Sequence, residues 1–89
     1  MDKNYPEYFE RVQSLMAGLG KEIPGTMNSF FKLHQVAVAE GALSTKIKEL
    51  IALSIAITVR CDGCISFHVR GALAAGASRE EIVEAIGVA

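Results

Sequence analysis

The chain has 89 residues, enough for one domain but too few for two of ordinary size. Apolar residues make up 51% of it, which excludes a disordered chain. Its 9 Lys and Arg residues against 10 Asp and Glu residues give a net charge of −1, so the basic surface that a nucleic-acid partner needs is missing. The longest uncharged apolar stretch, residues 50–59, is well below the roughly 18 residues of a membrane-spanning helix, and we expect no membrane partner.

The first part of the chain carries an apolar stripe that predicts an amphipathic helix, because its members recur every three or four positions. Asn4 is a suitable cap for this helix, and Pro6 falls in the first turn, where its missing N–H costs little. We expect Gly18 and Gly20 to end the helix. The stripe consists of Tyr5, Tyr8, Phe9, Val12, Leu15, Met16 and Leu19.

A second apolar stripe predicts another helix, which we expect to end at Gly41. His34 lies on its apolar side, where a histidine is more often a core or interface residue than a catalyst. Phe30 and Phe31 are likewise interpreted first as core residues. The stripe consists of Met27, Phe30, Phe31, His34, Ala37 and Val38.

A third helix is predicted to begin after Ser44 or Thr45, both good caps, and to continue to Val59. From Leu50 onward the segment is apolar on nearly every side, and its β-branched residues would also suit a strand. We favour a helix, because the apolar residues do not alternate with period two and no second strand is available to pair with this one. A helix of this kind is buried on every side, so it belongs at the centre of a bundle or at a subunit interface.

The last third of the chain predicts two further helices. Residues 60–63 interrupt the apolar pattern, and a fourth helix, thin because of its glycine and alanines, ends at Gly76. Ser78 and Glu81 match a capping box that opens a fifth helix. This helix reaches Ala89 without a stop signal, so we expect the sequence to be truncated there and the natural chain to continue. The prediction is a single all-α domain of about five helices over all 89 residues.

Two cysteines, Cys61 and Cys64, stand three residues apart and are followed by His68. Residues 1–6 contain no basic segment followed by an apolar run, so we expect no secretory signal and a cytoplasmic location. In that reducing compartment, cysteines more often perform chemistry or bind metal than hold a fold together. A disulfide closing so small a loop would stabilise the fold by about 2 kcal/mol or less. Exchange between dithiol and disulfide therefore explains the pair better.

Cys64 is the better nucleophile of the two. If the fourth helix begins near Asp62, Cys64 lies in its first turn, where backbone N–H groups and the helix dipole stabilise a thiolate. His68 follows four residues later on the same helix face and can take up or return the thiol proton, directly or through one water. This combination is typical of an activated thiol.

Glu49 is the only acidic residue of the predicted third helix. In an antiparallel hairpin that turns near Cys61, it would lie opposite residue 73, roughly 7 Å along the axis from the level of His68. We therefore do not expect direct contact, although a water, a helix tilt or a subunit boundary could close the gap. By itself, an acid near the start of a helix is interpreted as a surface residue that complements the dipole.

Glu49, Cys61, Cys64 and His68, in this spacing, resemble the core motif of the alkylhydroperoxidase D-like branch of the carboxymuconolactone decarboxylase superfamily. The resemblance covers residues 42–89. It implies an all-α fold that assembles into homotrimers or homohexamers, and an antioxidant thiol activity on hydroperoxides that uses no bound cofactor and no metal.

The resemblance also implies a role for each motif residue. Glu49 and His68 would deprotonate Cys64, which would attack the peroxide and become a sulfenic acid, and Cys61 would resolve it to the disulfide. An external dithiol would then reduce the pair; in the best-known members it is a protein-bound lipoyl group, and thioredoxin is another candidate. The archetypal members carry a histidine just before the second cysteine, where this chain has Gly63.

Three other interpretations stay open. Cys61, Cys64 and His68 could bind zinc, although structural zinc sites use four ligands and only three are in view. His68 and Glu49 could act as acid and base in a decarboxylase-like lyase with the cysteines as bystanders. The chain could also be a helical oligomerisation module without chemistry, in which the cysteines are small buried apolar groups.

Overall fold

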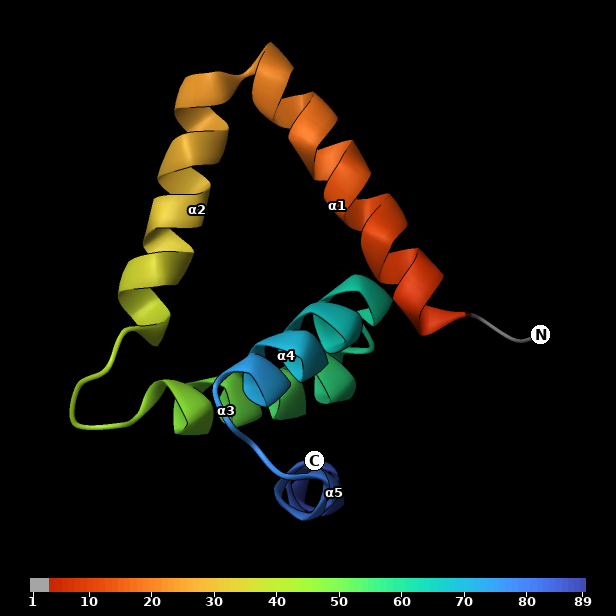
Figure 1. Cartoon of the computed structure of the whole chain (residues 1–89), viewed down its shortest axis with the longest axis vertical. Helices are drawn as coiled ribbons and strands as arrows, with labels where there is room; N and C mark the ends of the chain where they lie inside the picture. Colours follow the sequence, from red (N-terminus) through yellow and green to blue (C-terminus); the bar gives the residue numbers. More distant parts are fainter. Residues whose placement is uncertain (1–3) are drawn as a thin grey trace. The chain divides into compact units, whose positions relative to one another are not determined.

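The computed structural model describes residues 4–89, so residues 1–3 of the segment searched for a secretory signal lie outside the described residues. This part of the chain is helical and contains no strand, which confirms the predicted all-α class with five helices. The helices, coloured along the chain in Figure 1, are α1 (Tyr5–Glu22), α2 (Pro24–Val38), α3 (Thr45–Val59), α4 (Asp62–Ala74) and α5 (Arg79–Val88). None of these helices is long and apolar enough to cross a lipid bilayer.

The helices fall into two compact units, one through Ala39 and one from Glu40 to Ala89. The first unit contains α1 and α2, and the second contains α3, α4 and α5. The cysteine motif and Glu49 both belong to the second unit.

α1 begins as predicted but ends later. Asn4 caps it, with Oδ1 accepting a hydrogen bond from the backbone N–H of Glu7 at 3.2 Å. The prediction that Gly18 and Gly20 end the helix is wrong, because neither has the left-handed backbone that a terminating glycine adopts. The helix instead ends at Glu22, because the ring of Pro24 disfavours the helical conformation at the cap residue Ile23.

α2 begins at Pro24, a residue well suited to the first position of a helix, and ends at Val38. Gly41 therefore lies three residues outside the helix that it was predicted to end. Phe30 and Phe31 are 55% and 37% exposed, so their assignment to the core is wrong within the chain. A unit of two helices offers each helix only one partner, and part of each apolar stripe stays uncovered.

In the second unit, α3 and α4 lie side by side as an antiparallel pair, and α5 packs against α3 (Figure 1). Of the two predicted caps of α3, Ser44 or Thr45, the cap is Ser44, whose Oγ accepts from the backbone N–H of Ile47 at 3.1 Å. Ser54 on α3 donates to the carbonyl of Ala85 on α5 at 3.3 Å and so links those helices. The fully buried side chains of this unit are Leu53, Ala56 and Ala72.

One face of α3 is not covered within the chain. Ile51, Ile55 and Val59 follow one another at intervals of four residues and are 46%, 58% and 64% exposed. The prediction that α3 is buried on every side is therefore wrong for the single chain, because α4 and α5 cover only the face that carries Leu53. A subunit interface over the exposed face stays a prediction.

The turn between α3 and α4 is short and closes α3 tightly. Arg60 has a left-handed backbone with φ of 61°, which is unusual for a residue other than glycine. Its N–H donates to Ile57 O at 3.1 Å, and the N–H of Cys61 donates to Ala56 O at 3.0 Å. This pair of bonds forms a Schellman motif. α4 can therefore begin at Asp62 and run back along α3.

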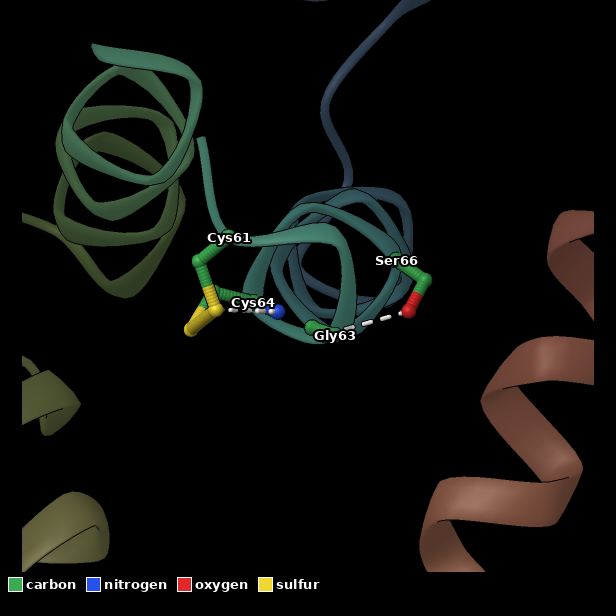
Figure 2. Close-up of a disulfide and its surroundings, with 4 residues drawn as sticks. All are labelled: Cys61, Gly63, Cys64 and Ser66. Atoms are coloured by element: carbon green, nitrogen blue, oxygen red, sulfur yellow. Dashed lines mark hydrogen bonds between the residues drawn. A yellow bond between two sulfur atoms is a disulfide. The ribbon is translucent and has the colours of Figure 1, made fainter. Parts of the chain in front are cut away.

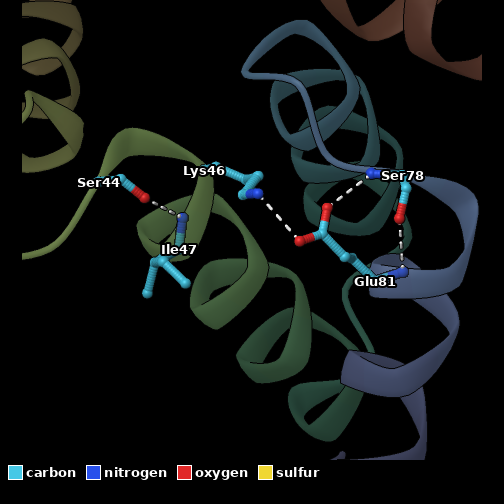
Figure 3. A network of polar contacts seen from close by, with 5 residues as sticks. All are labelled: Ser44, Lys46, Ile47, Ser78 and Glu81. Carbon is cyan, nitrogen blue, oxygen red and sulfur yellow. Dashed lines mark hydrogen bonds and ion pairs between the residues drawn. The ribbon is translucent and has the colours of Figure 1, made fainter.

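The opposite end of α4 and the start of α5 follow the predicted pattern. Gly76 ends α4 with φ of 94°, and Ser78 and Glu81 form the capping box. Lys46 Nζ lies 2.9 Å from Glu81 Oε2 and ties α5 to α3 (Figure 3). The backbone hydrogen bond from Ser78, followed by the bond from Lys46, lowers the pKa of the Glu81 carboxyl below its ordinary value.

Candidate functional site

The cysteine pair lies where α4 begins. Cys61 is the cap residue of the helix, and its Sγ accepts a hydrogen bond from the backbone N–H of Cys64 at 3.3 Å (Figure 2). The two cysteines are joined by a disulfide, with their Cα atoms 5.2 Å apart. Cys64 lies in the first turn of α4, as predicted from the position of Asp62. The capping role of Cys61 is an addition that the sequence analysis missed.

Ser66 lies directly after the first turn of α4. Its side chain is buried, and Oγ donates to the carbonyl of Gly63 at 3.0 Å (Figure 2). The hydroxyl is therefore satisfied by the helix itself. Among residues 4–89, no buried side-chain nitrogen or oxygen atom lacks a partner.

Glu49 and His68 are in direct contact. His68 Nδ1 lies 2.9 Å from Glu49 Oε1, and the two side chains are 19% and 5% exposed. Both expectations about Glu49 are wrong: it is buried and not a surface residue, and it reaches His68 without a water or a second subunit. An antiparallel hairpin that turns near Cys61 predicts Glu49 opposite residue 73, five residues beyond His68. Its carboxylate instead lies against Gly71, three residues beyond His68.

The contact with Glu49 determines which nitrogen of the neutral His68 ring carries the hydrogen. A carboxylate can only accept hydrogen bonds, so Nδ1 of His68 carries the hydrogen and Nε2 is the acceptor nitrogen of the neutral ring. His68 and Cys64 are four residues apart on α4 and so share one helix face. The arrangement can take a proton from a thiol on that face and return it.

The metal-site alternative and His34 can also be compared with the structure. Within the described part of the chain, no group of three or more His, Cys, Asp or Glu side chains is positioned to hold a metal ion. His34, interpreted from the sequence as a packing residue, is half-buried in α2 and belongs to the first unit.

The sequence model of the Carboxymuconolactone decarboxylase family matches residues 24–89. The chain belongs to the carboxymuconolactone decarboxylase family. This family member is 45% identical over 62 residues to an uncharacterized protein, number 4 in the cox locus, of Paracoccus denitrificans; the match covers 70% of the chain and 56% of that protein. It is 36% identical over 77 residues to an uncharacterized protein of Cupriavidus necator, over 86% of the chain and 68% of that protein.

A solved structure agrees with the fold. The family member superposes with a TM-score of 0.90 on the apo crystal structure of a carboxymuconolactone decarboxylase family protein from Legionella pneumophila, at 36% identity. The match covers 98% of the chain and 78% of the Legionella protein. The resemblance inferred from the four motif residues is thus confirmed for the superfamily and for the all-α fold.

Gly71 is a site residue that the sequence analysis did not identify. In the sequence, the glycine and alanines of the fourth helix predict only a helix with small side chains, whereas in the structure Gly71 lies directly beneath the Glu49 carboxylate. A glycine inside a helix, one turn after a candidate histidine, is the sequence signal that could have found it.

Proposed function

We propose that this family member is a thiol-dependent oxidoreductase that reduces hydroperoxides through Cys61 and Cys64. The observation that supports this most directly is the contact between Glu49 of α3 and His68, which lies on α4 one turn beyond Cys64 of the disulfide. A CxxC pair alone would suit many redox proteins. A buried carboxylate that orients an imidazole supplies the base which a thiol needs to become a nucleophile.

The proposed cycle begins when a hydroperoxide binds next to Cys61 and Cys64, both in the thiol form. His68 accepts the proton of Cys64, and the thiolate attacks one peroxide oxygen. The O–O bond breaks, the alcohol leaves with the proton returned by His68, and Cys64 becomes a sulfenic acid. The Cys61 thiol then attacks the Cys64 sulfur, water leaves, and the disulfide forms. An external dithiol reduces this disulfide and is itself oxidised, which restores both thiols.

The position of each cysteine suits its proposed role. Cys64, inside the first turn of α4, is exposed to the positive end of the helix dipole, which favours its thiolate. Cys61 is the cap residue and lies outside the first turn, with its sulfur against the backbone N–H of Cys64. The disulfide in Figure 2 corresponds to the oxidised form that the cycle leaves.

The proposal includes the partners expected from the resemblance. They are a small-molecule hydroperoxide, an external dithiol such as a lipoyl protein or thioredoxin, and further copies of the chain in a trimer or hexamer. The exposed apolar face of α3, formed by Ile51, Ile55 and Val59, supports self-association, because apolar side chains in a row are stabilised by burial against a partner.

A second candidate function uses the same pair differently. Glu49 and His68 are joined directly, as an acid/base lyase of the decarboxylase type would need, and such an enzyme would not use the cysteines. The two candidates differ in whether Cys64 is required. A lyase would keep its activity in a Cys64→Ser variant.

The deciding experiment measures peroxide consumption with dihydrolipoamide, with thioredoxin and with neither reductant. We expect turnover that depends on a dithiol and that Cys64→Ser abolishes, while the helical circular dichroism is unchanged. Full peroxide turnover by Cys64→Ser would show that the assigned nucleophile is wrong. Metal analysis of the freshly purified protein is run beside it, because stoichiometric zinc would favour the metal-site alternative.

A further inference from the structure

Gly71 lies in the interior of α4, directly under the carboxylate of Glu49 from α3. A Cβ atom added at residue 71 would lie 2.6 Å from Glu49 Cδ and 3.2 Å from Oε1, and it would overlap Oε2. The carbon–carbon approach is well inside the contact distance of nonbonded atoms. Any side chain at residue 71 therefore has to displace the Glu49 carboxylate.

The backbone does not explain this glycine. Within residues 4–89, Gly76 is the one glycine with a left-handed backbone, so Gly71 has a helical conformation that alanine adopts readily. Glycine in the interior of a helix is less favourable than alanine, since it loses more conformational freedom on folding. The advantage of Gly71 must therefore come from the space that its missing side chain leaves.

The other glycines show that this close approach is specific. A Cβ added at Gly18, Gly25 or Gly87 would meet no atom within 4 Å. The space next to Gly71 is occupied by the one buried acidic side chain among the described residues. A hydrogen-bonded carboxylate cannot move aside without loss, because Glu49 is enclosed between α3 and α4 and its Oε1 contacts His68.

The two carboxylate oxygens of Glu49 have different neighbours. Oε2 lies against Gly71, and Oε1 meets Nδ1 of His68, one turn nearer the cysteine pair. Because an added Cβ would approach Cδ as well as Oε2, rotation of the carboxylate does not relieve the overlap, and the whole group, Oε1 included, has to shift. The contact between Glu49 and His68 thus depends on the absence of a side chain at residue 71.

We propose that Gly71 is a positioning residue for the proposed peroxide reduction: its missing side chain leaves the space that holds Glu49 Oε2, so that Oε1 can orient His68 toward the thiol chemistry. The proposal rests on the function proposed above. Gly71 touches neither the substrate nor the sulfur atoms and acts only through Glu49.

The test compares Gly71→Ala with Glu49→Gln, which keeps the shape of the side chain but removes its charge. The matched control is Gly87→Ala in α5, where an added methyl group meets open space. Two readouts are used: the protonated ring nitrogen of His68, observed by nitrogen-15 NMR, and the pH profile of Cys64 alkylation in the reduced protein. Neither readout requires peroxide turnover, so they decide the role of Gly71 even if the proposed peroxidase activity fails.

We expect Gly71→Ala to reduce the fraction of His68 protonated at Nδ1 and to move the alkylation profile in the same direction as Glu49→Gln. If the peroxidase proposal holds, turnover should fall by about 10- to 100-fold, the loss expected from a displacement of about 1 Å. Gly87→Ala should match the wild type in all three measurements. A folded Gly71→Ala variant with the wild-type ring signal and alkylation profile would overturn the proposal.

A second variant covers the case in which Gly71→Ala does not fold. Combining it with Glu49→Asp shortens the carboxylate side chain by one methylene group and withdraws it from the space above residue 71. Recovery of folding in the double variant would support the overlap between residue 71 and Glu49. A double variant that stays unfolded would contradict it, because the space would then serve something other than the carboxylate.

Discussion

His68 Nδ1 lies 2.9 Å from Glu49 Oε1, and this contact joins α4 to α3 one helical turn from the disulfide. The carboxylate is buried and the ring is four-fifths buried, so little water competes for the hydrogen bond. A buried carboxylate needs such a partner, because removing it from water without one is costly. The pair is therefore both a structural link between two helices and the base of the proposed relay.

Removing the His68 imidazole should lower the stability of the fold and change the pH profile of Cys64 alkylation. His68→Ala takes a partner from the buried Glu49 carboxylate, and we expect the free energy of unfolding to fall by about 1–3 kcal/mol in urea titration. The pH profile of Cys64 alkylation should move to higher pH. His34→Ala, at the half-buried histidine of α2, is the matched control and should leave the alkylation profile unchanged. An unchanged profile in His68→Ala would remove this residue from the relay.

Cys61→Ser should trap the proposed intermediate. Without a resolving thiol, the sulfenic acid on Cys64 cannot become a disulfide, and dimedone should label it after one addition of peroxide. The helix should persist, because serine is a preferred cap residue and its Oγ can replace the sulfur as acceptor for the Cys64 N–H. Mass spectrometry locates the adduct. The absence of an adduct on Cys64 would count against the resolving role of Cys61.

Glu81 predicts a pH dependence of stability. Its pKa is lower in the folded protein than the ordinary 4.5, first because of the Ser78 backbone hydrogen bond and then because of Lys46. A group of this kind stabilises the fold above its ordinary pKa, and the stabilisation is lost as the pH falls through the lower folded value. The difference in Tm between the wild type and Glu81→Gln should be present at pH 7 and shrink below pH 4.5. An equal difference at pH 7 and in acid would show that the charge contributes nothing.

Arg60 should tolerate glycine well. Its left-handed backbone costs a residue with a Cβ roughly 1–2 kcal/mol, and glycine avoids this cost but gains freedom in the unfolded chain. We expect Arg60→Gly to raise the free energy of unfolding by up to about 1 kcal/mol. Gly76→Ala, at the equivalent position of α4, should lower it. Thermal unfolding of both variants tests this, and a loss of stability in Arg60→Gly would mean that its side chain contributes more than the backbone strain removes.

The sequence by itself determined the features that depend on near neighbours in the chain. Asn4, Ser44 and Ser78 were identified as caps because each cap bonds to a backbone N–H three residues on. The start of α4 at Asp62, and with it the position of Cys64 in the first turn, followed from the same local reasoning. Where a competing local signal was overlooked, as with the proline after Ile23, the predicted helix end was wrong.

Only the tertiary structure decided the relation between Glu49 and His68. Whether the two meet depends on the register of α3 against α4, and a difference of two residues along a helix is about 3 Å, enough to separate a hydrogen bond from no contact. In the folded chain the Glu49 carboxylate lies against α4 at Gly71, a residue that has no side chain. No local pattern encodes a fit between two surfaces nineteen or more residues apart in the chain, so the cysteines and His68 could be found from their spacing but the direct contact of His68 with Glu49 could not.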